Sequence, residues 1–193
     1  MLVIDLQRQF TELNSPFVVD GADGLVSRTI EFADRARSCG AAVIWVRQVA
    51  RPELGPGRAT GRFRGGSSLH RGAFAELDPR IRIAPGDSEV VKRRQSAFFE
   101  TDLDQLLRAL GVCRVVITGV TTNVCCLATA IDAAARNYDV VACRDMTRAL
   151  PIKNESRPSL TAEEARDNAL AFIDYSCGPV VTSHELLGEG SRP

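Results

Sequence analysis

The chain alternates short apolar runs with stretches of helical periodicity, and this alternation constrains its fold more than any other feature. The runs contain few polar residues, so strands formed from them must be buried on both faces. Such burial is typical of a parallel sheet covered by helices on each side. The sequence therefore predicts an α/β fold, a three-layer α-β-α arrangement with a six-stranded, mainly parallel, Rossmann-like sheet, as a single domain over residues 1–193. The expected strands are residues 2–4, 42–46, 89–92, 113–118, 139–143 and 179–182.

Helical patterns fill most of the intervals between these runs. Apolar spacing predicts helices over residues 24–39 and 102–110, each ended by a glycine. A further helix over residues 160–175 is expected to begin with Thr161 as its N-cap, with Glu163 and Glu164 in its first turn. Two segments, residues 51–70 and 151–158, are predicted to be loops, and we expect them to shape a pocket.

Charge and cysteine content limit the partners of the chain. The 24 basic residues balance the 24 acidic ones, so net charge gives no reason to expect nucleic acid or an anionic membrane as a partner. No apolar run approaches the roughly 20 residues that span a bilayer. The six cysteines show no zinc-binding spacing, and reduced, mostly buried thiols are expected. Together with the lack of a signal-peptide pattern, this usage predicts a cytoplasmic protein.

One segment joins a strand to a thiol. The apolar run that ends near Thr118 is followed by Gly119, a polar turn, Cys125 and an alanine-rich helical stretch. This order places the thiol near a helix N-terminus at the carboxyl end of a strand. The helix dipole and the free amides there favour a thiolate and bind an oxyanion, so we expect a depressed pKa for Cys125.

Two other reactive residues stand at the ends of predicted strands. Asp5 closes the first strand and Lys92 closes the third. Because the carboxyl ends of parallel strands meet at one edge of a sheet, the carboxylate, the ammonium and the thiol of Cys125 are expected to share a pocket. Simpler readings stay open: Asp5 as a solvated strand end, Lys92 as part of a basic turn, and Cys125 as a small core residue beside Cys126.

The sequence resembles the isochorismatase-like cysteine hydrolases, the superfamily that includes nicotinamidase, N-carbamoylsarcosine amidase and ureidoacrylate amidohydrolase. The resemblance rests on residues 2–7 with Phe10, residues 91–92 with 96–99 and 101–103, residues 119–125, and residues 130–134. It implies an Asp5, Lys92 and Cys125 triad, a cis peptide between Val120 and Thr121, and an oxyanion hole made by the Thr121 and Cys125 amides. It also implies a homo-oligomer, either a dimer or a tetramer.

The expected activity is a cofactor-independent hydrolysis of a small amide or carbamoyl substrate through a thioester. We expect substrate contacts from four residues, Gln7, Phe10, Trp45 and Phe98. Residues 47–52 contain no histidine, so the metal site of metal-dependent nicotinamidases is not expected. Two alternatives remain: hydrolysis of a vinyl ether of the isochorismate type, and a non-catalytic, redox-sensing role for the adjacent thiols of Cys125 and Cys126. The sequence leaves the small-molecule substrate open.

Overall fold

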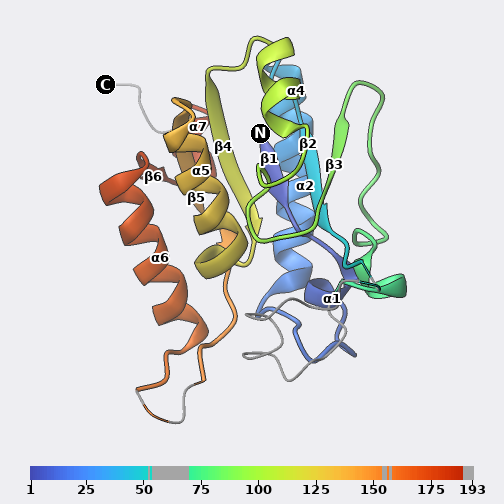
Figure 1. Cartoon of the computed structure of the whole chain (residues 1–193), viewed down its shortest axis with the longest axis vertical. Helices are drawn as coiled ribbons and strands as arrows, with labels where there is room; N and C mark the ends of the chain where they lie inside the picture. Colours follow the sequence, from blue (N-terminus) through green and yellow to red (C-terminus); the bar gives the residue numbers. More distant parts are fainter. Residues whose placement is uncertain (52, 54–69, 154–155, 157, 189–193) are drawn as a thin grey trace.

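A computed structural model describes residues 1–51, 53, 70–153, 156 and 158–188. Its centre is a six-stranded sheet with the order β3-β2-β1-β4-β5-β6, in which every neighbouring pair is parallel (Figure 1). This is the doubly wound arrangement predicted from the sequence. The strands are β1 (Leu2–Ile4), β2 (Ile44–Gln48), β3 (Ser88–Lys92), β4 (Arg114–Val120), β5 (Asp139–Arg148) and β6 (Val180–Val181).

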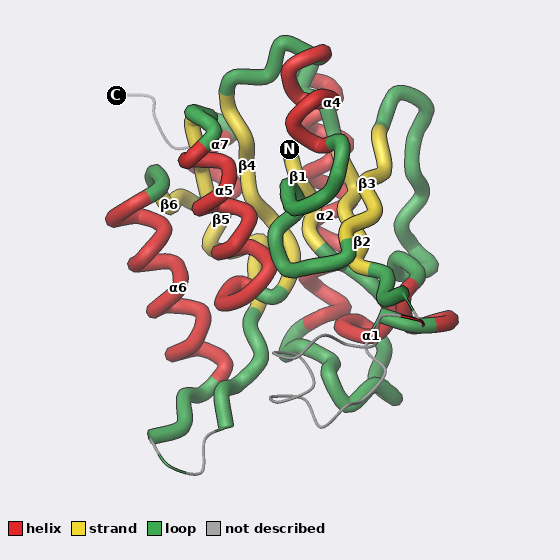
Figure 2. The backbone as a smooth tube through the Cα atoms, viewed as in Figure 1, coloured by secondary structure: helices red, strands yellow, loops and turns green. Residues whose placement is uncertain are grey.

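Helices cover the sheet on both faces, as the tube in Figure 2 shows. One apolar cluster joins one face of the sheet to α4, α5 and α6, and the other joins the opposite face to α2. Besides the short helices α1 and α7, the structure contains a 3₁₀ turn at Gly72–Ala75 and a π-helical turn at Thr122–Cys126. The helices are α1 (Arg8–Thr11), α2 (Ala22–Ser38), α4 (Leu103–Ala109), α5 (Leu127–Ala135), α6 (Ala162–Ser176) and α7 (Ser183–Leu186).

The strand order reverses between β1 and β4, which lie side by side at the centre of the sheet. Their contact is unusually close at Gly119, where a Cβ atom would lie 2.0 Å from the carbonyl oxygen of Ile4. In doubly wound sheets the crevice at this reversal, outside the carboxyl ends of the strands, is the usual place for a ligand site. Both β1 and the segment after β4 therefore deliver their next residues to one crevice.

The predicted elements match the structure except at several ends. Thr161 caps α6 in a capping box with Glu164, as expected. Strand β2 extends to Gln48, two residues beyond the predicted end, and β5 continues to Arg148. Most of the predicted loop 51–70, and residues 154, 155 and 157 of the loop 151–158, lie outside the described residues. Within the described ranges, no helix has both the length and the apolar character needed to cross a membrane.

Candidate active site

Asp5 is the first residue after β1, and the backbone turns sharply there. Its φ is +52°, in the left-handed region that Asp tolerates better than most residues. The amide of Asp5 still donates to the Val46 oxygen at 2.8 Å, which fixes the turn to the end of β2. The carboxylate is completely buried. Local backbone geometry therefore places a desolvated acid at the crevice.

Lys92 is the last residue of β3, and its side chain is also completely buried. Its Nζ lies 2.8 Å from Asp5 Oδ2 and 3.3 Å from Cys125 Sγ. It donates further hydrogen bonds to Gln48 Oε1 at 2.9 Å and to the Arg94 carbonyl at 3.1 Å. The ammonium thus sits between the acid and the thiol, surrounded by oxygen and sulfur acceptors.

Cys125 lies in a π-helical turn, Thr122–Cys126, that leads directly into α5. The Thr121 carbonyl accepts hydrogen bonds from the amides of Val124 and Cys126, at 3.1 and 3.2 Å. The peptide bond between Val120 and Thr121 is cis. Cys125 Sγ faces Lys92 Nζ at 3.3 Å, while Cys126 is packed in the core with no exposed surface. The structure thus brings together the three residues that the sequence pointed to.

The environment raises the pKa of all three groups. Burial raises the pKa of Asp5, and the Lys92 charge only partly opposes this effect. Burial would lower the pKa of Lys92, but the Asp5 carboxylate and the Cys125 sulfur outweigh it, so the pKa is raised. Burial raises the pKa of the Cys125 thiol to about 12, with Lys92 opposing the shift and Asp5 adding to it. In the unliganded protein the thiol is therefore protonated and Lys92 is charged.

This result corrects the expectation of a depressed pKa for Cys125. A helix N-terminus and a nearby cation both favour a thiolate, and both can be recognised in the sequence. The loss of hydration cannot: Cys125 is only 5% exposed and lies near the buried Asp5 carboxylate. Desolvation disfavours the charged form and is the largest of these effects here.

Gln48 is a member of this cluster that the sequence analysis missed. Besides accepting from Lys92, its Oε1 lies 3.9 Å from Cys125 Sγ. Its place in register with Lys92 explains the contact, because paired residues of parallel strands point to the same face. The rule that selects the carboxyl ends of strands applies to Gln48 as well. Gln48 could not be recognised as a strand end from the sequence, because the apolar run that marks β2 ends at Val46.

The four residues expected to bind substrate make contacts with other parts of the protein. The Gln7 amide is committed to backbone groups, donating to the Gln48 and Ala75 carbonyls at 2.9 and 2.6 Å. Phe10 and Trp45 belong to the apolar cluster on the α2 face, not to the one that contains Cys125. The Trp45 indole donates to Asp87 at 2.8 Å.

Phe98 shares the cluster that contains Cys125 but packs at the far end of α5. Its ring centroid is 5.9 Å from that of Tyr138 and 5.0 Å from the guanidinium carbon of Arg136. Both of these residues follow α5, whereas Cys125 precedes it. The substrate contacts expected of Gln7, Phe10, Trp45 and Phe98 stay a prediction.

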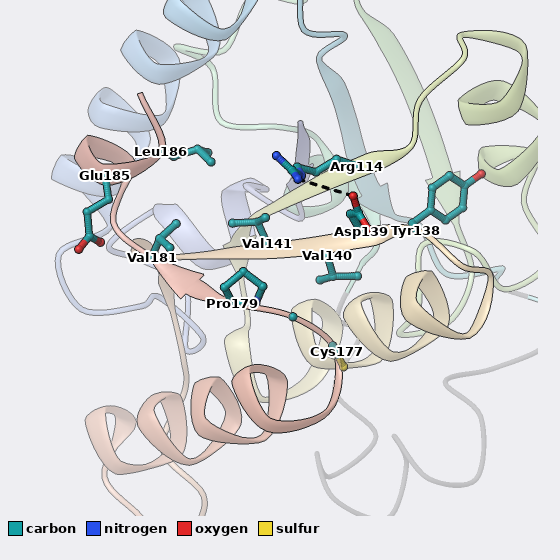
Figure 3. Close-up of a pocket in the computed structure, with 11 residues that line it drawn as sticks. Arg114, Tyr138, Asp139, Val140, Val141, Cys177, Pro179, Val181, Glu185 and Leu186 are labelled. Carbon is teal, nitrogen blue, oxygen red and sulfur yellow. Dashed lines mark ion pairs between the residues drawn. The ribbon is translucent and has the colours of Figure 1, made fainter. Parts of the chain in front are cut away.

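A cavity of about 490 Å³ lies beside β5 and β6 and is lined in part by Cys177 (Figure 3). Its lining includes Arg114 and Asp139, the first residues of β4 and β5, together with Pro179 and Val181. Arg114 and Asp139 mark the amino-terminal side of the sheet, whereas Asp5, Lys92 and Cys125 follow or end strands at the carboxyl side. The cavity is thus separate from the candidate site.

The described part of the chain contains no group of three or more His, Cys, Asp or Glu side chains arranged to hold a metal ion. The last residue of β2 shows one reason. Gln48 is neutral and its oxygen already faces the Lys92 ammonium, which would repel a cation. The donor set at this crevice therefore does not fit a metal site.

Known proteins are similar to this chain in sequence and in architecture. Residues 1–185 match the isochorismatase domain. A probable inactive nicotinamidase of Arabidopsis thaliana is 35% identical over 163 residues, covering 77% of this chain and 80% of that protein. A ureidoacrylate amidohydrolase of Variovorax paradoxus is 31% identical over 172 residues, covering 78% of this chain and 68% of that protein.

A solved structure described as a cysteine hydrolase from Pseudomonas syringae pv. phaseolicola superposes with a TM-score of 0.89 at 28% identity. The match covers 97% of this chain and 89% of that chain. The domain match spans almost the entire described structure. The chain therefore belongs to the isochorismatase family of hydrolases.

Proposed function

We propose that the chain is a cysteine-dependent hydrolase that cleaves the C–N bond of a small amide or carbamoyl compound through a thioester on Cys125. One observation carries the proposal: the Lys92 ammonium contacts Asp5 Oδ2 at 2.8 Å and Cys125 Sγ at 3.3 Å, in a buried site. An acid, a cation and a thiol in mutual contact are the parts that nucleophilic catalysis requires. The relative named ureidoacrylate amidohydrolase supports a C–N bond as the target.

Acylation begins with a proton transfer. Asp5 takes the proton from Cys125 Sγ, and the raised pKa of this carboxyl makes it a better base than an exposed aspartate. The sulfur attacks the substrate carbonyl carbon, and the carbonyl electron pair moves to its oxygen. When that pair returns, the C–N bond breaks, and the leaving nitrogen receives the proton held by Asp5. Ammonia or an amine departs, and the acyl group remains on sulfur.

Deacylation uses the same groups in reverse. Asp5 takes a proton from water, and the resulting hydroxide attacks the thioester carbonyl. The C–S bond breaks, the acid product leaves, and the proton on Asp5 returns to Cys125 Sγ. Lys92 stays protonated throughout, because its pKa is raised, and its charge stabilises each anion that forms on sulfur. No cofactor takes part in these steps.

The oxyanion of each tetrahedral intermediate is assigned to the Thr121 and Cys125 amides. Cys125 lies in the π-helical turn Thr122–Cys126, which begins directly after Thr121. Backbone amides held in a regular turn need little reorganisation during a reaction, which is why such donors are effective at developing charge. The roles of Asp5, Lys92, Cys125 and Thr121 are parts of one proposal and are tested together.

The redox-sensing alternative is weakened by the environment of the two thiols. Sensor cysteines are typically exposed and have low pKa values. Here burial raises the pKa of Cys125 to about 12 and that of Cys126 well above its usual range. Vinyl-ether hydrolysis needs an acid but no nucleophilic sulfur, so the position of Cys125 against Lys92 favours amide hydrolysis over it.

The test is a screen for ammonia or amine release from linear amides, ureido acids and cyclic imides, with nicotinamide and a vinyl ether included. We expect turnover of an amide or ureido compound by the wild-type chain and none by Cys125→Ser. A thioester adduct on the Cys125 peptide, detected by mass spectrometry after rapid quenching, would support the covalent step. Turnover that persists in Cys125→Ser, or cleavage of the vinyl ether alone, would exclude the proposed mechanism.

A homo-oligomer and a cytoplasmic location remain proposals that follow from the resemblance and the cysteine usage. The outer face of α6 exposes Phe172 and Tyr175, which are 50% and 90% accessible. Large exposed aromatic side chains are common at contacts between protein copies. Sedimentation analysis of the purified chain would show whether it is a monomer, a dimer or a tetramer.

A further inference from the structure

Gln7 closes a gap in the sheet directly beside the candidate site. Strand β1 pairs with β2 in the register Leu2 to Ile44 and Ile4 to Val46, and then turns away at Asp5. Strand β2 continues to Gln48. In a parallel ladder, alternate residues direct both backbone groups to the same neighbour. Val46 and Ile44 bond toward β1, so the amide and carbonyl of Gln48 face the side that β1 has left.

The Gln7 side chain takes the place of the missing strand. Its Oε1 accepts from the Gln48 amide at 3.0 Å, and its Nε2 donates to the Gln48 carbonyl at 2.9 Å. The second Nε2 hydrogen donates to the Ala75 carbonyl at 2.6 Å, and the whole residue is buried. A carboxamide has the same donor and acceptor as a peptide unit, so it pairs with both backbone groups of Gln48 as a further residue of β1 would.

The residue held in this way is the one whose side chain contacts the proposed catalytic groups. Gln48 Oε1 accepts from Lys92 Nζ at 2.9 Å and lies 3.9 Å from Cys125 Sγ. Apart from Asp5 and Cys125, the other acceptor for Lys92 is the Arg94 carbonyl at 3.1 Å. The direction of the ammonium therefore depends on where the Gln48 backbone is fixed.

We propose that Gln7 is a positioning residue that acts through Gln48: its clamp on the Gln48 backbone holds Oε1 in line to orient the Lys92 ammonium between Asp5 and Cys125. The effect on turnover rests on the proposed function. The effect on the thiol does not, because Lys92 lowers the pKa of Cys125 whether or not a substrate is bound. If the clamp is released, the ammonium is held less firmly and the thiolate loses stabilisation.

The test is a double-mutant cycle with Gln7→Met, Gln48→Ala and the combined variant. Methionine keeps the length of the side chain and removes both hydrogen bonds to Gln48 and the one to Ala75. Gln7→Met is expected to slow alkylation of Cys125 about threefold or more at pH 10, through loss of thiolate. It is expected to lower kcat about tenfold with a smaller change in KM, as a misplaced group does. In the Gln48→Ala background, Gln7→Met should change neither quantity further.

Gln9→Met is the matched control. Gln9 is also a buried glutamine, 1% exposed, and its amide pairs with His70. It also donates to Gln7 Oε1 over a long 3.5 Å, but among the described residues no hydrogen bond joins its side chain to Gln48, so its removal leaves both Gln7–Gln48 bonds in place. It should lose a comparable amount of stability while alkylation and kcat stay near wild type. Equal effects of the two substitutions, or a Gln7→Met effect that persists with Gln48→Ala, would overturn the proposal.

If Gln7→Met does not fold, Gln7→Asn and Gln9→Asn provide the same comparison with a shortened amide. Asparagine keeps the polar group but is one methylene too short to span both Gln48 backbone groups. The alkylation measurement requires no substrate, so it decides the role of Gln7 even if no amide in the screen is hydrolysed. An unchanged alkylation profile in Gln7→Asn would count against the clamp.

Discussion

The Lys92 ammonium lies 2.8 Å from Asp5 Oδ2, and neither side chain has any exposed surface. Removing two charges from water is unfavourable, and their mutual attraction compensates only in part. The raised pKa of Asp5 shows that burial outweighs the attraction of Lys92 for this carboxylate. The pair therefore serves the chemistry of the crevice more than the stability of the fold.

The first prediction concerns the stability of this pair. Lys92→Met leaves Asp5 buried beside an apolar chain and is expected to lower the free energy of unfolding by about 3–5 kcal/mol at pH 7. The double variant Asp5→Asn with Lys92→Met removes both charges and should be less destabilised than Lys92→Met alone. Urea unfolding monitored by circular dichroism measures both values. A double variant as unstable as the sum of the single ones would show that the charges do not interact.

The second prediction concerns the pH dependence of Cys125 alkylation. With a thiol pKa of about 12, the thiolate fraction rises about tenfold for each pH unit below that value. The rate constant for iodoacetamide should therefore keep increasing from pH 7 to pH 10 without a plateau. Mass spectrometry of the labelled peptide identifies the sulfur. A plateau near neutral pH would mean that a thiolate is already formed in the free protein.

The variant Asp5→Asn tests in which direction Asp5 shifts the pKa of Cys125. Asp5 raises the pKa of Cys125, so removing its charge should lower that pKa and speed alkylation at a given pH. Turnover should nevertheless fall by roughly 10²–10⁴-fold, because the proposed base is lost. Asparagine also tolerates the positive φ of position 5, which makes the substitution conservative for the backbone. Slower alkylation in this variant would instead assign Asp5 the role of base for the unliganded thiol.

The sequence predicted the layers, the parallel sheet and the meeting of Asp5, Lys92 and Cys125, because all of these follow from strand periodicity and from the rule about carboxyl ends. Sheet faces were harder to assign. Trp45 alternates with Ile44 and Val46, which lie in the cluster that contains Cys125, so Trp45 faces α2 instead.

The sign of the Cys125 pKa shift was also beyond the sequence, for a physical reason. A helix N-terminus and a lysine can be recognised from the order of residues, whereas the depth of burial depends on how several elements pack. The carboxamide of Gln7 is a similar case. The Gln7 carboxamide forms hydrogen bonds to the backbone of Gln48 and Ala75. A pattern of side chains in the sequence cannot reveal such backbone partners.

The third prediction separates the two adjacent thiols. Cys125→Ser is expected to abolish turnover while folding normally. Cys126→Ser places a hydroxyl in a site with no exposed surface, so it should lose about 1–2 kcal/mol of stability and keep most of its activity. Activity assays and thermal melts of both variants make the comparison. Equal loss of activity would mean that the reactive sulfur has been wrongly assigned.

The fourth prediction is that chelation leaves activity unchanged. The mechanism proposed for Asp5, Lys92 and Cys125 contains no step that uses a metal, and the oxygens of Asp5 and Gln48 at this crevice already contact the Lys92 ammonium. The protein should therefore retain its rate after prolonged dialysis against a chelator. The control is the same sample with zinc or iron added back. A loss of rate on dialysis that either metal restores would contradict the mechanism.

The fifth prediction concerns Gly119, the residue that lets β4 approach β1. Its φ is +104°, and an added Cβ would lie 2.0 Å from the Ile4 carbonyl oxygen and 2.6 Å from the Ile4 nitrogen. Both atoms belong to the backbone one residue before Asp5, so no flexible side chain can yield. Gly119→Ala should either prevent folding or push β1 and Asp5 away from Lys92, with loss of turnover in both cases.

Gly86→Ala is the control that separates crowding from backbone strain at Gly119. Gly86 has a similar φ of +94°, but an added Cβ there would meet no atom within 4 Å. It should therefore show only the strain of a non-glycine residue in the left-handed region, about 1–3 kcal/mol. Thermal melts and turnover of the two variants make the comparison. If Gly119→Ala were no worse than Gly86→Ala, the close contact of β4 with Ile4 would not be what holds Asp5 in place.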